Sequence, residues 1–349
     1  MVYILELKTT QAAAMKIVTD AINSLLTDAN FDFYPYYIED NADSECDSKK
    51  EDENSDSESN DDYESESEDE DSDSNSDSDQ YIKKKITKKN SKEKSEKNTK
   101  SKKEEKSSTT EGEKKKTIGG VVLKEVNKTG KILVYMRLDA DKFDVYKYNY
   151  HKKKLTLGID IGNLLKCLKC MSHFDTMTWQ VDSDDMNKLT IILDSTERKE
   201  KKKFSLNLMD LEEEKYEVEP IDFPFSITLP STDFHKYCKD MSSATDKIEI
   251  MCTKNKVIFS GTGELGQAEF EVGETNGGLS IEVNSNCTDE IVQGLFELRF
   301  LIIFTKCTNL CNTVTLYLKN DYPLIVRYAI TGLGEVKLVL SPSKPNDKY

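Results

Sequence analysis

Two kinds of hydrophobic spacing alternate along this chain. Val2–Leu7 alternates at strand period, and Met15, Val18, Ile22 and Leu25 then recur at the spacing of one helix face, to about residue 26. A second alternating run covers residues 31–37. The first pattern therefore predicts a strand, a helix and a strand.

The same order occurs twice. From residue 117 the pattern predicts strands, including KILVYMRL at 131–138, then a helix at 162–171 and strands at 176–181, 188–193 and 203–209. From residue 225 it predicts a strand, a helix capped by Ser231, four strands, a helix at 298–306 and three strands. This recurrence predicts an α+β fold of two similar domains, each with a largely antiparallel sheet and two helices.

A highly charged tract interrupts the first half. Residues 39–80 hold 21 acidic residues and 2 lysines, and residues 81–116 hold 15 lysines and 6 acidic residues. With so few apolar side chains we expect residues 39–116 to be a disordered insertion in the connection between two strands. Phosphorylation, pairing of the two halves, attraction of basic partners and simple solvation all remain open as its role.

A tether separates the two halves. The stretch LNLMDLEEEKYEVEPIDFPF at 206–225 contains Pro220 and Pro224, which interrupt regular structure. Its apolar side chains, among them Tyr216 and Val218, make it a candidate docking site. We therefore predict an N-terminal domain at 1–205, a connector at 206–225 and a C-terminal domain at 226–349.

Signs of catalysis are weak. Gly261, Gly263 and Gly266 spell GxGxxG, but the alternating run QAEFEV follows instead of a helix, which favours a hairpin over a nucleotide site. Cys167 and Cys170 form a CxxC without a second pair. We expect no active site, metal or cofactor, no membrane segment, and free thiols in a reducing intracellular compartment.

Basic residues recur on the polar faces of the predicted helices. Lys166 and Lys169 are three positions apart, and Lys236 and Lys239 repeat that spacing on the corresponding helix. Arg299 and Lys306 share a face of the last helix. In an acidic protein, with net charge −16, this pattern favours a local surface for a polyanion over ordinary solvated helix faces.

Several blocks resemble one family. LGIDIGNLLKCLKC, FSLNLMDLEEE, LPSTDFHKYCKDMSS, VIFSGTGELG, LRFLIIFTKC and YPLIVRYAI, in this order, closely resemble the sliding clamp family, proliferating cell nuclear antigen. The resemblance implies the DNA clamp fold and a homotrimeric ring whose helices surround double-stranded DNA. The DNA-facing residues it implies are Lys16, Lys166, Lys169, Lys236, Lys239, Arg299 and Lys306.

The resemblance also implies partners. DNA polymerase and other proteins that carry a clamp-binding motif would insert it beside the connector, and a clamp loader would open the ring. The implied pocket residues are Val126, Leu133, Tyr216, Val218, Pro323 and Pro342. Gly130, where the family commonly has histidine, and Glu219, where it has proline, leave the motif preference open. Lys254 matches a position that eukaryotic members use for ubiquitin attachment.

Subunits of the family join edge to edge. The interface residues implied here are Phe204, Leu206 and Leu208 on one copy and Leu265, Gly266 and Phe270 on the next. The charged insertion departs from the family pattern and suggests a divergent, large-virus member, acting in the nucleus or in a cytoplasmic viral factory. Two alternatives are a monomeric or dimeric processivity factor that holds DNA directly, and a nucleotide-binding enzyme that uses the turn at 261–266.

Overall fold

The computed structural model describes residues 2–39, 116–172, 175–195, 197–213, 221–264, 266–285 and 289–343. Most of the charged tract, and with it the prediction of disorder, lies outside these residues, as do Tyr216, Val218 and Leu265. The segments on either side of the tract belong to one compact unit.

The first half follows the predicted order. Its elements are β1 (Tyr3–Thr9), α1 (Ala12–Asn23), β2 (Asp28–Glu39), β3 (Lys116–Val126), β4 (Ile132–Asp139), the 3₁₀ helix η1 (Ala140–Lys142), β5 (Val145–Tyr148), β6 (Leu155–Asp160), α2 (Ile161–Lys169), β7 (Thr176–Asp182), β8 (Lys188–Ser195) and β9 (Glu200–Asn207).

The second half repeats it. Its elements are β10 (Phe225–Pro230), α3 (Ser231–Ser242), β11 (Lys247–Thr253), β12 (Lys256–Gly263), β13 (Gly266–Gly273), β14 (Ser280–Val283), β15 (Ile291–Glu297), α4 (Leu298–Phe304), the 3₁₀ helix η2 (Thr305–Leu310), β16 (Thr313–Leu318), β17 (Leu324–Ile330) and β18 (Gly334–Leu340). Two details differ from prediction. Pro230, not Ser231, is the N-cap of α3, and the last helix ends at Phe304, so that Lys306 lies on η2.

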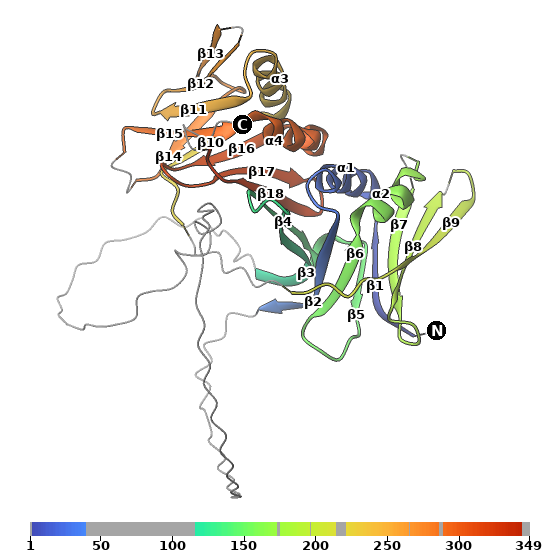
Figure 1. The fold of residues 1–349 in the computed structure, drawn as a ribbon. Coiled ribbons are helices and arrows are strands. Elements are labelled where there is room, and N and C mark those ends of the chain that lie inside the picture. Colours follow the sequence, from blue (N-terminus) through green and yellow to red (C-terminus); the bar gives the residue numbers. More distant parts are fainter. Residues whose placement is uncertain are drawn as a thin grey trace, which may run out of the picture. The chain divides into compact units, whose positions relative to one another are not determined.

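The strands form three antiparallel sheets (Figure 1). One has the order β5-β1-β7-β8-β9, and a second has the order β13-β12-β11-β15. The third, of nine strands, has the order β14-β10-β16-β17-β18-β4-β3-β2-β6 and joins the two halves where β18 pairs with β4. The predicted α+β architecture with antiparallel sheets is confirmed.

One face of the sheets is buried under the helices. Alternate residues of each central strand, such as Val134, Met136 and Leu138 on β4, are almost completely buried, whereas their neighbours are half-buried on the outer face. Helix α1 packs against α2 and η2, and η2 packs against α3 and α4, so the helices form one continuous layer across both halves. In the part of the chain that the structure describes, no helix is long and apolar enough to cross a membrane.

Candidate functional surfaces

Helix α2 shows how the predicted basic residues are positioned. The Asp160 side chain accepts a hydrogen bond from the Asn163 backbone N–H at 2.7 Å and caps the first turn. At the other end, Lys202 Nζ donates to the Cys170 carbonyl at 2.9 Å, where a cation suits the helix dipole. With both ends held and the apolar stripe buried, Lys166 and Lys169 are exposed.

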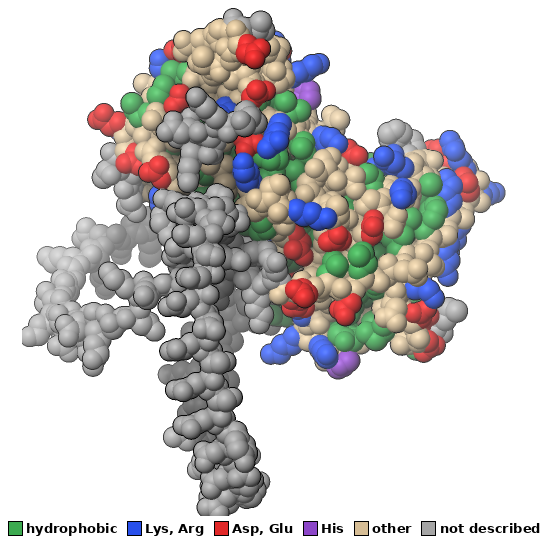
Figure 2. Space-filling view, viewed as in Figure 1, with side chains coloured by type: hydrophobic (Ala, Val, Ile, Leu, Met, Phe, Trp, Pro, Cys, Tyr) green, Lys and Arg blue, Asp and Glu red, His purple; other side chains and the backbone are tan. Residues whose placement is uncertain are grey.

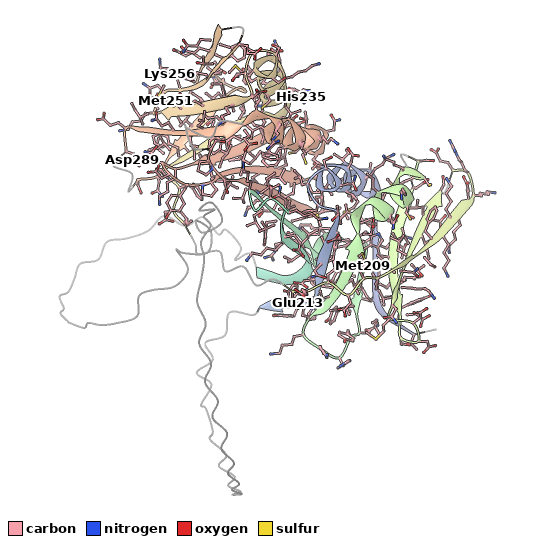
Figure 3. The ribbon with its side chains drawn as sticks, in the orientation of Figure 1. Met209, Glu213, His235, Met251, Lys256 and Asp289 are labelled. Carbon is pink, nitrogen blue, oxygen red and sulfur yellow. The ribbon has the colours of Figure 1, made fainter. Side chains whose placement is uncertain are left out.

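The predicted DNA-facing residues all lie on the helix layer. Lys236 and Lys239 are exposed on α3, Arg299 is exposed on α4 and Lys306 is exposed on η2, whereas Lys16 is half-buried on α1. Figure 3 labels His235 on α3, next to this pair of lysines. The structure therefore brings the seven residues to one layer of helices.

Their charges are not equally available. Lys306 Nζ lies 3.3 Å from Asp20 Oδ2 on α1 and donates to Ser24 Oγ at 2.7 Å. Arg299 Nη2 lies 2.5 Å from Glu297, and its guanidinium stands over the Phe300 ring at 4.6 Å. Lys306 is therefore neutralised within the chain, whereas Arg299 shares the single negative charge of Glu297 with Lys131.

The other five predicted residues are lysines that have no carboxylate partner in the described part of the chain. Lys166 donates to the neutral amide oxygen of Asn163 at 3.0 Å. Among the described residues, no ion pair involves Lys16, Lys169, Lys236 or Lys239. Positive charge without a carboxylate partner is thus concentrated on α1, α2 and α3, where a polyanion would replace solvent.

An ion pair of Glu297 with Lys131 links the two halves. This carboxylate is 7% exposed and lies 2.6 Å from Lys131 Nζ, just before β4. Burial alone would raise the Glu297 pKa, but the hydrogen bond from Lys131 and the charges of Lys131 and Arg299 hold it below the ordinary value of 4.5. The pair is therefore charged at neutral pH and stabilises the contact between β15 and the start of β4.

The outer face of the nine-stranded sheet carries an apolar row. Cross-strand pairs join Val126 to Leu133, Leu133 to Val339, Val339 to Ile325 and Ile325 to Tyr317, in a line across five strands. All five side chains are half-buried. We call this line the outer apolar row, and it forms a continuous surface on which an apolar motif could pack.

The predicted pocket residues are only part of this surface. Val126 and Leu133 belong to the outer apolar row, Pro323 is half-buried before β17, and Pro342 is exposed after β18. Val339, Ile325 and Tyr317 were not predicted. Strand alternation puts them on an outer face, but the pairing of β18 with β4, which aligns them with Leu133, cannot be inferred from local pattern.

The two described ends of the connector contact the nine-stranded sheet near opposite ends of its strand order. Met209 N–H donates to the Gly158 carbonyl of β6, and Glu213 lies 3.0 Å from Lys154 Nζ (Figure 3). At the far end the Phe223 ring contacts Tyr317 at 5.8 Å. The connector thus begins at β6 and reaches the outer apolar row at Phe223, and Tyr216 and Val218 fall in its part outside the described residues.

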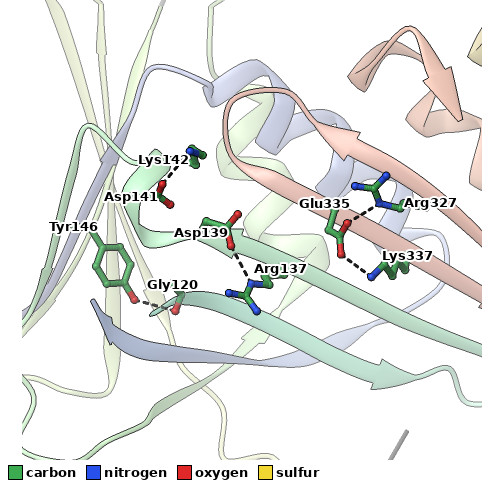
Figure 4. A network of polar contacts seen from close by, with 9 residues as sticks. All are labelled: Gly120, Arg137, Asp139, Asp141, Lys142, Tyr146, Arg327, Glu335 and Lys337. Atoms are coloured by element: carbon green, nitrogen blue, oxygen red, sulfur yellow. Dashed lines mark hydrogen bonds and ion pairs between the residues drawn. The ribbon is translucent and has the colours of Figure 1, made fainter. Parts of the chain in front are cut away.

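Polar side chains lie beside the outer apolar row. Glu335 accepts from Arg327 Nε at 2.6 Å and from Lys337 Nζ at 2.7 Å, and Arg137 Nε donates to Asp139 at 2.9 Å (Figure 4). Of these, only the contact of Arg327 with Glu335 joins two strands, and it supports the register of β17 and β18 next to the apolar surface. The other two contacts lie within β18 and within β4.

In the part of the chain that the structure describes, two long sheet edges have no neighbouring strand. The outer edge of β6 is bridged by Met209, and that of β15 is occupied by Asn320 and Ser343. β5 and β14 are short, at 4 residues each. Within the described ranges, no backbone hydrogen bond reaches the outer edge of β9 or of β13.

The predicted interface residues lie at these two edges. Phe204 and Leu206 on β9, Leu208 just after it, and Phe270 on β13 are half-buried on the side that faces the helices. Gly266 opens β13 with φ +125, and Leu265 lies outside the described residues. Figure 2 shows basic side chains gathered over β8 and β9. Unpaired strand edges of this kind are templates for pairing with another chain.

The glycine motif has a packing role. Gly261 and Gly263 lie in β12 and Gly266 begins β13, so the motif spans the turn of a hairpin and is followed by a strand, where a dinucleotide site requires a helix. A Cβ at Gly263 would lie 1.9 Å from the Ala244 carbonyl oxygen. Gly261 and Gly263 therefore allow β12 to approach the turn after α3, whereas a Cβ at Gly266 would meet no atom within 4 Å.

The remaining candidate reactive residues are cysteines, histidines and Lys254. Burial raises the pKa of the Cys167 thiol, and Cys170 is exposed. Among the described residues, no group of three histidine, cysteine or acidic side chains is placed to hold a metal. His151 and His235 are exposed, His173 lies outside the described residues, and Lys254 is exposed in the turn between β11 and β12.

Two family models match the chain in succession. Residues 111–216 match the model described as proliferating cell nuclear antigen, N-terminal domain. Residues 217–343 match the model described as proliferating cell nuclear antigen, C-terminal domain. The matches run in the family's order and cover most of the described residues after the charged tract.

Proposed function

Since the chain belongs to the proliferating cell nuclear antigen family, and so has a sliding-clamp type of function in DNA replication and is not an enzyme, we propose that three copies close into a ring around duplex DNA. The ring tethers DNA polymerase and other replication and repair proteins to the template, after a clamp loader has opened it. It acts wherever the DNA is replicated, in the nucleus or in a cytoplasmic viral factory.

The sheet topology carries this proposal. The nine-stranded sheet consists of a five-stranded array of the second half, ending at β18, and a four-stranded array of the first half, beginning at β4. The same two arrays occur once more, with β9 and β13 as their free edges. Pairing β9 of one copy with β13 of the next repeats the internal joint, and successive head-to-tail joints close into a ring when the rotation permits.

The helix layer supports enclosure of DNA. Lysines without carboxylate partners lie on α1, α2 and α3 of one layer, and a ring that must slide needs diffuse attraction to phosphates without base contacts. Lysine suits this role because its ammonium group is a mobile point charge on a flexible stem. Lys16, Lys166, Lys169, Lys236 and Lys239 carry most of the attraction.

The outer apolar row supports partner binding. Aromatic or aliphatic anchors of a clamp-binding motif would bury the surface from Val126 to Tyr317, beside a connector that contributes Tyr216 and Val218. Apolar anchors in such a site dominate binding free energy. Docking on the outer face leaves the helix layer facing the DNA.

Sedimentation of the full chain at micromolar concentration tests the ring. We expect the mass of three chains at low salt. A monomer or dimer under all conditions would contradict the ring and favour a factor that holds DNA by direct contact. A second measurement follows clamps loaded on nicked circular DNA. They should stay on the circle and leave when one cut makes the DNA linear, because an enclosing ring slides off an end.

A further inference from the structure

The two halves of the chain meet where β18 pairs with β4, which we call the internal joint. Because the halves are similar, this pairing predicts, residue by residue, how β9 of one copy pairs with β13 of the next, which we call the joint between copies. Thr27 and Asp246 accept corresponding backbone hydrogen bonds from the first residues of α2 and α4, which aligns the two halves. From these residues we follow the cross-strand pairs through β2, β3 and β4 in the first half and through β11, β12 and β13 in the second half. By this alignment, Arg137 on β4 corresponds to Glu271 on β13. The same step relates Tyr135 to Glu269.

The opposite edge is aligned in the same way. β7 and β16 contain the matching runs TMTW at 176–179 and TVTL at 313–316. Following the pairs outward through β8 and β17, Glu335 on β18 corresponds to Lys201 on β9, and Lys337 corresponds to Lys203. Both edges of the joint between copies are thus placed in register.

At the internal joint, Glu335 stands opposite Arg137, and Lys337 stands opposite Tyr135 with Nζ 5.6 Å from the ring centroid. We propose, on the basis of the ring proposed above, that the same register between copies places Lys201 opposite Glu271 and Lys203 opposite Glu269 of the next copy. Each joint is then held by two ion pairs on the outer face of the sheet.

The four side chains fit this role. Lys201, Lys203, Glu269 and Glu271 are all exposed on the outer face. Within the chain, Glu271 Oε2 lies 2.9 Å from Lys256 Nζ, and its other oxygen is left to accept from Lys201 of a neighbour. Opposite charges directly across an antiparallel pair stabilise it, and like charges destabilise it.

The apolar side of the joint agrees with this register. Phe204 on the helix-facing side of β9 stands opposite Ala268, whose small side chain leaves room for the ring. A slip by one residue would turn every side chain to the other face. A slip by two would leave only one of Lys201 and Lys203 opposite a glutamate, so the register in which both are paired is favoured.

The charge order also distinguishes the two kinds of joint. The internal joint has its acidic residue on β18 and its basic residue on β4, whereas the joint between copies has lysines on β9 and glutamates on β13. A wrong pairing of β9 with β4 would set Lys201 against Arg137. Pairing of β18 with β13 would set Glu335 against Glu271 and would leave Lys337 opposite Glu269 as its one favourable pair. The reversal favours closure by the correct edges.

Charge exchange tests this assignment. We would measure the dissociation constant of the joint between two copies of the full chain, by sedimentation equilibrium at low salt. The variants are K201E/K203E, E269K/E271K and the quadruple variant that combines them. Each double variant should raise the constant about tenfold or more, and the quadruple variant should recover at least most of the loss. K152E/K153E is the control for K201E/K203E, because it makes the same change in net charge at an exposed turn away from both edges.

The outcomes separate this inference from the ring itself. A wild-type chain that never associates overturns the ring, and the inference with it. If the wild type forms a trimer and both double variants have the same dissociation constant as the wild type, only the ion pairs are overturned. Double variants that weaken the trimer without recovery in the quadruple variant also overturn the pairing. Raised salt should weaken the wild-type joint more than that of the double variant K201Q/K203Q, which has no such pairs.

Discussion

Replacing Lys166, Lys169, Lys236 and Lys239 by glutamine removes positive charge from α2 and α3 without breaking any ion pair in the described residues. Each lysine that neutralises a phosphate contributes about 0.9 to the slope of log K against log salt concentration. The variant therefore loses at most about 3.6 from this slope per copy, and less if only some lysines contact phosphate at one time. Its affinity for DNA at low salt falls accordingly.

The assay is fluorescence anisotropy of a labelled blunt duplex titrated with the full chain at several salt concentrations. The variant D20N/K306Q is the matched control, because it removes an existing ion pair and leaves the net charge unchanged. We expect a wild-type slope in the control and a shallower slope in the lysine variant. Equal slopes for the lysine variant and the wild type would refute the assignment of these lysines to DNA.

Two further predictions concern the outer face and the internal joint. I325S/V339S should weaken binding of a clamp-motif peptide at least tenfold in calorimetry and leave the oligomer mass unchanged, because both residues lie in the outer apolar row. E297Q should lower the free energy of unfolding by about 1–3 kcal/mol at pH 7. Since the Glu297 pKa is lowered in the folded state, its stabilisation is present above pH 4.5 and is lost on acidification, so wild type and E297Q should converge in urea melts at low pH.

The repeated order of elements could be predicted because it depends on local pattern. Half-buried strands such as β4 alternate strictly, and helices such as α2 carry one apolar stripe. The lysines at 166 and 169 follow from helix spacing once the buried face is known. Element ends were less certain: η2 tightens the turn after Phe304 into a 3₁₀ helix, so Lys306 lies beyond α4.

Long-range pairing could not be predicted from the sequence. Val339 joins Leu133 across β18 and β4, and Lys131 reaches Glu297 over 166 positions of the chain. Lys306 looks like any other basic residue on a polar face, but it is neutralised by Asp20, which lies far away in the sequence. Alternation determines which face a side chain takes, whereas only the fold determines its neighbour across the sheet.

The helices at the joint between copies lead to a last prediction. The alignment of the two halves matches Lys306 to Lys169 and Asp20 to Lys239. In the proposed ring, the ion pair that joins η2 to α1 inside the chain would be replaced, between copies, by two lysines that repel each other. In the proposed ring, duplex DNA would neutralise this repulsion, so DNA should tighten the joint.

The variant K239D creates the missing ion pair at this position. It should lower the joint dissociation constant without DNA by about fivefold, which corresponds to about 1 kcal/mol at 25 °C. It should also reduce the tightening that a short duplex causes in sedimentation. K236D is the control, since it makes the same charge change on α3 at a position that corresponds to the apolar Ile17. If K236D strengthens the joint as much as K239D, net charge explains the effect, and the correspondence between the internal joint and the joint between copies does not extend to the helices.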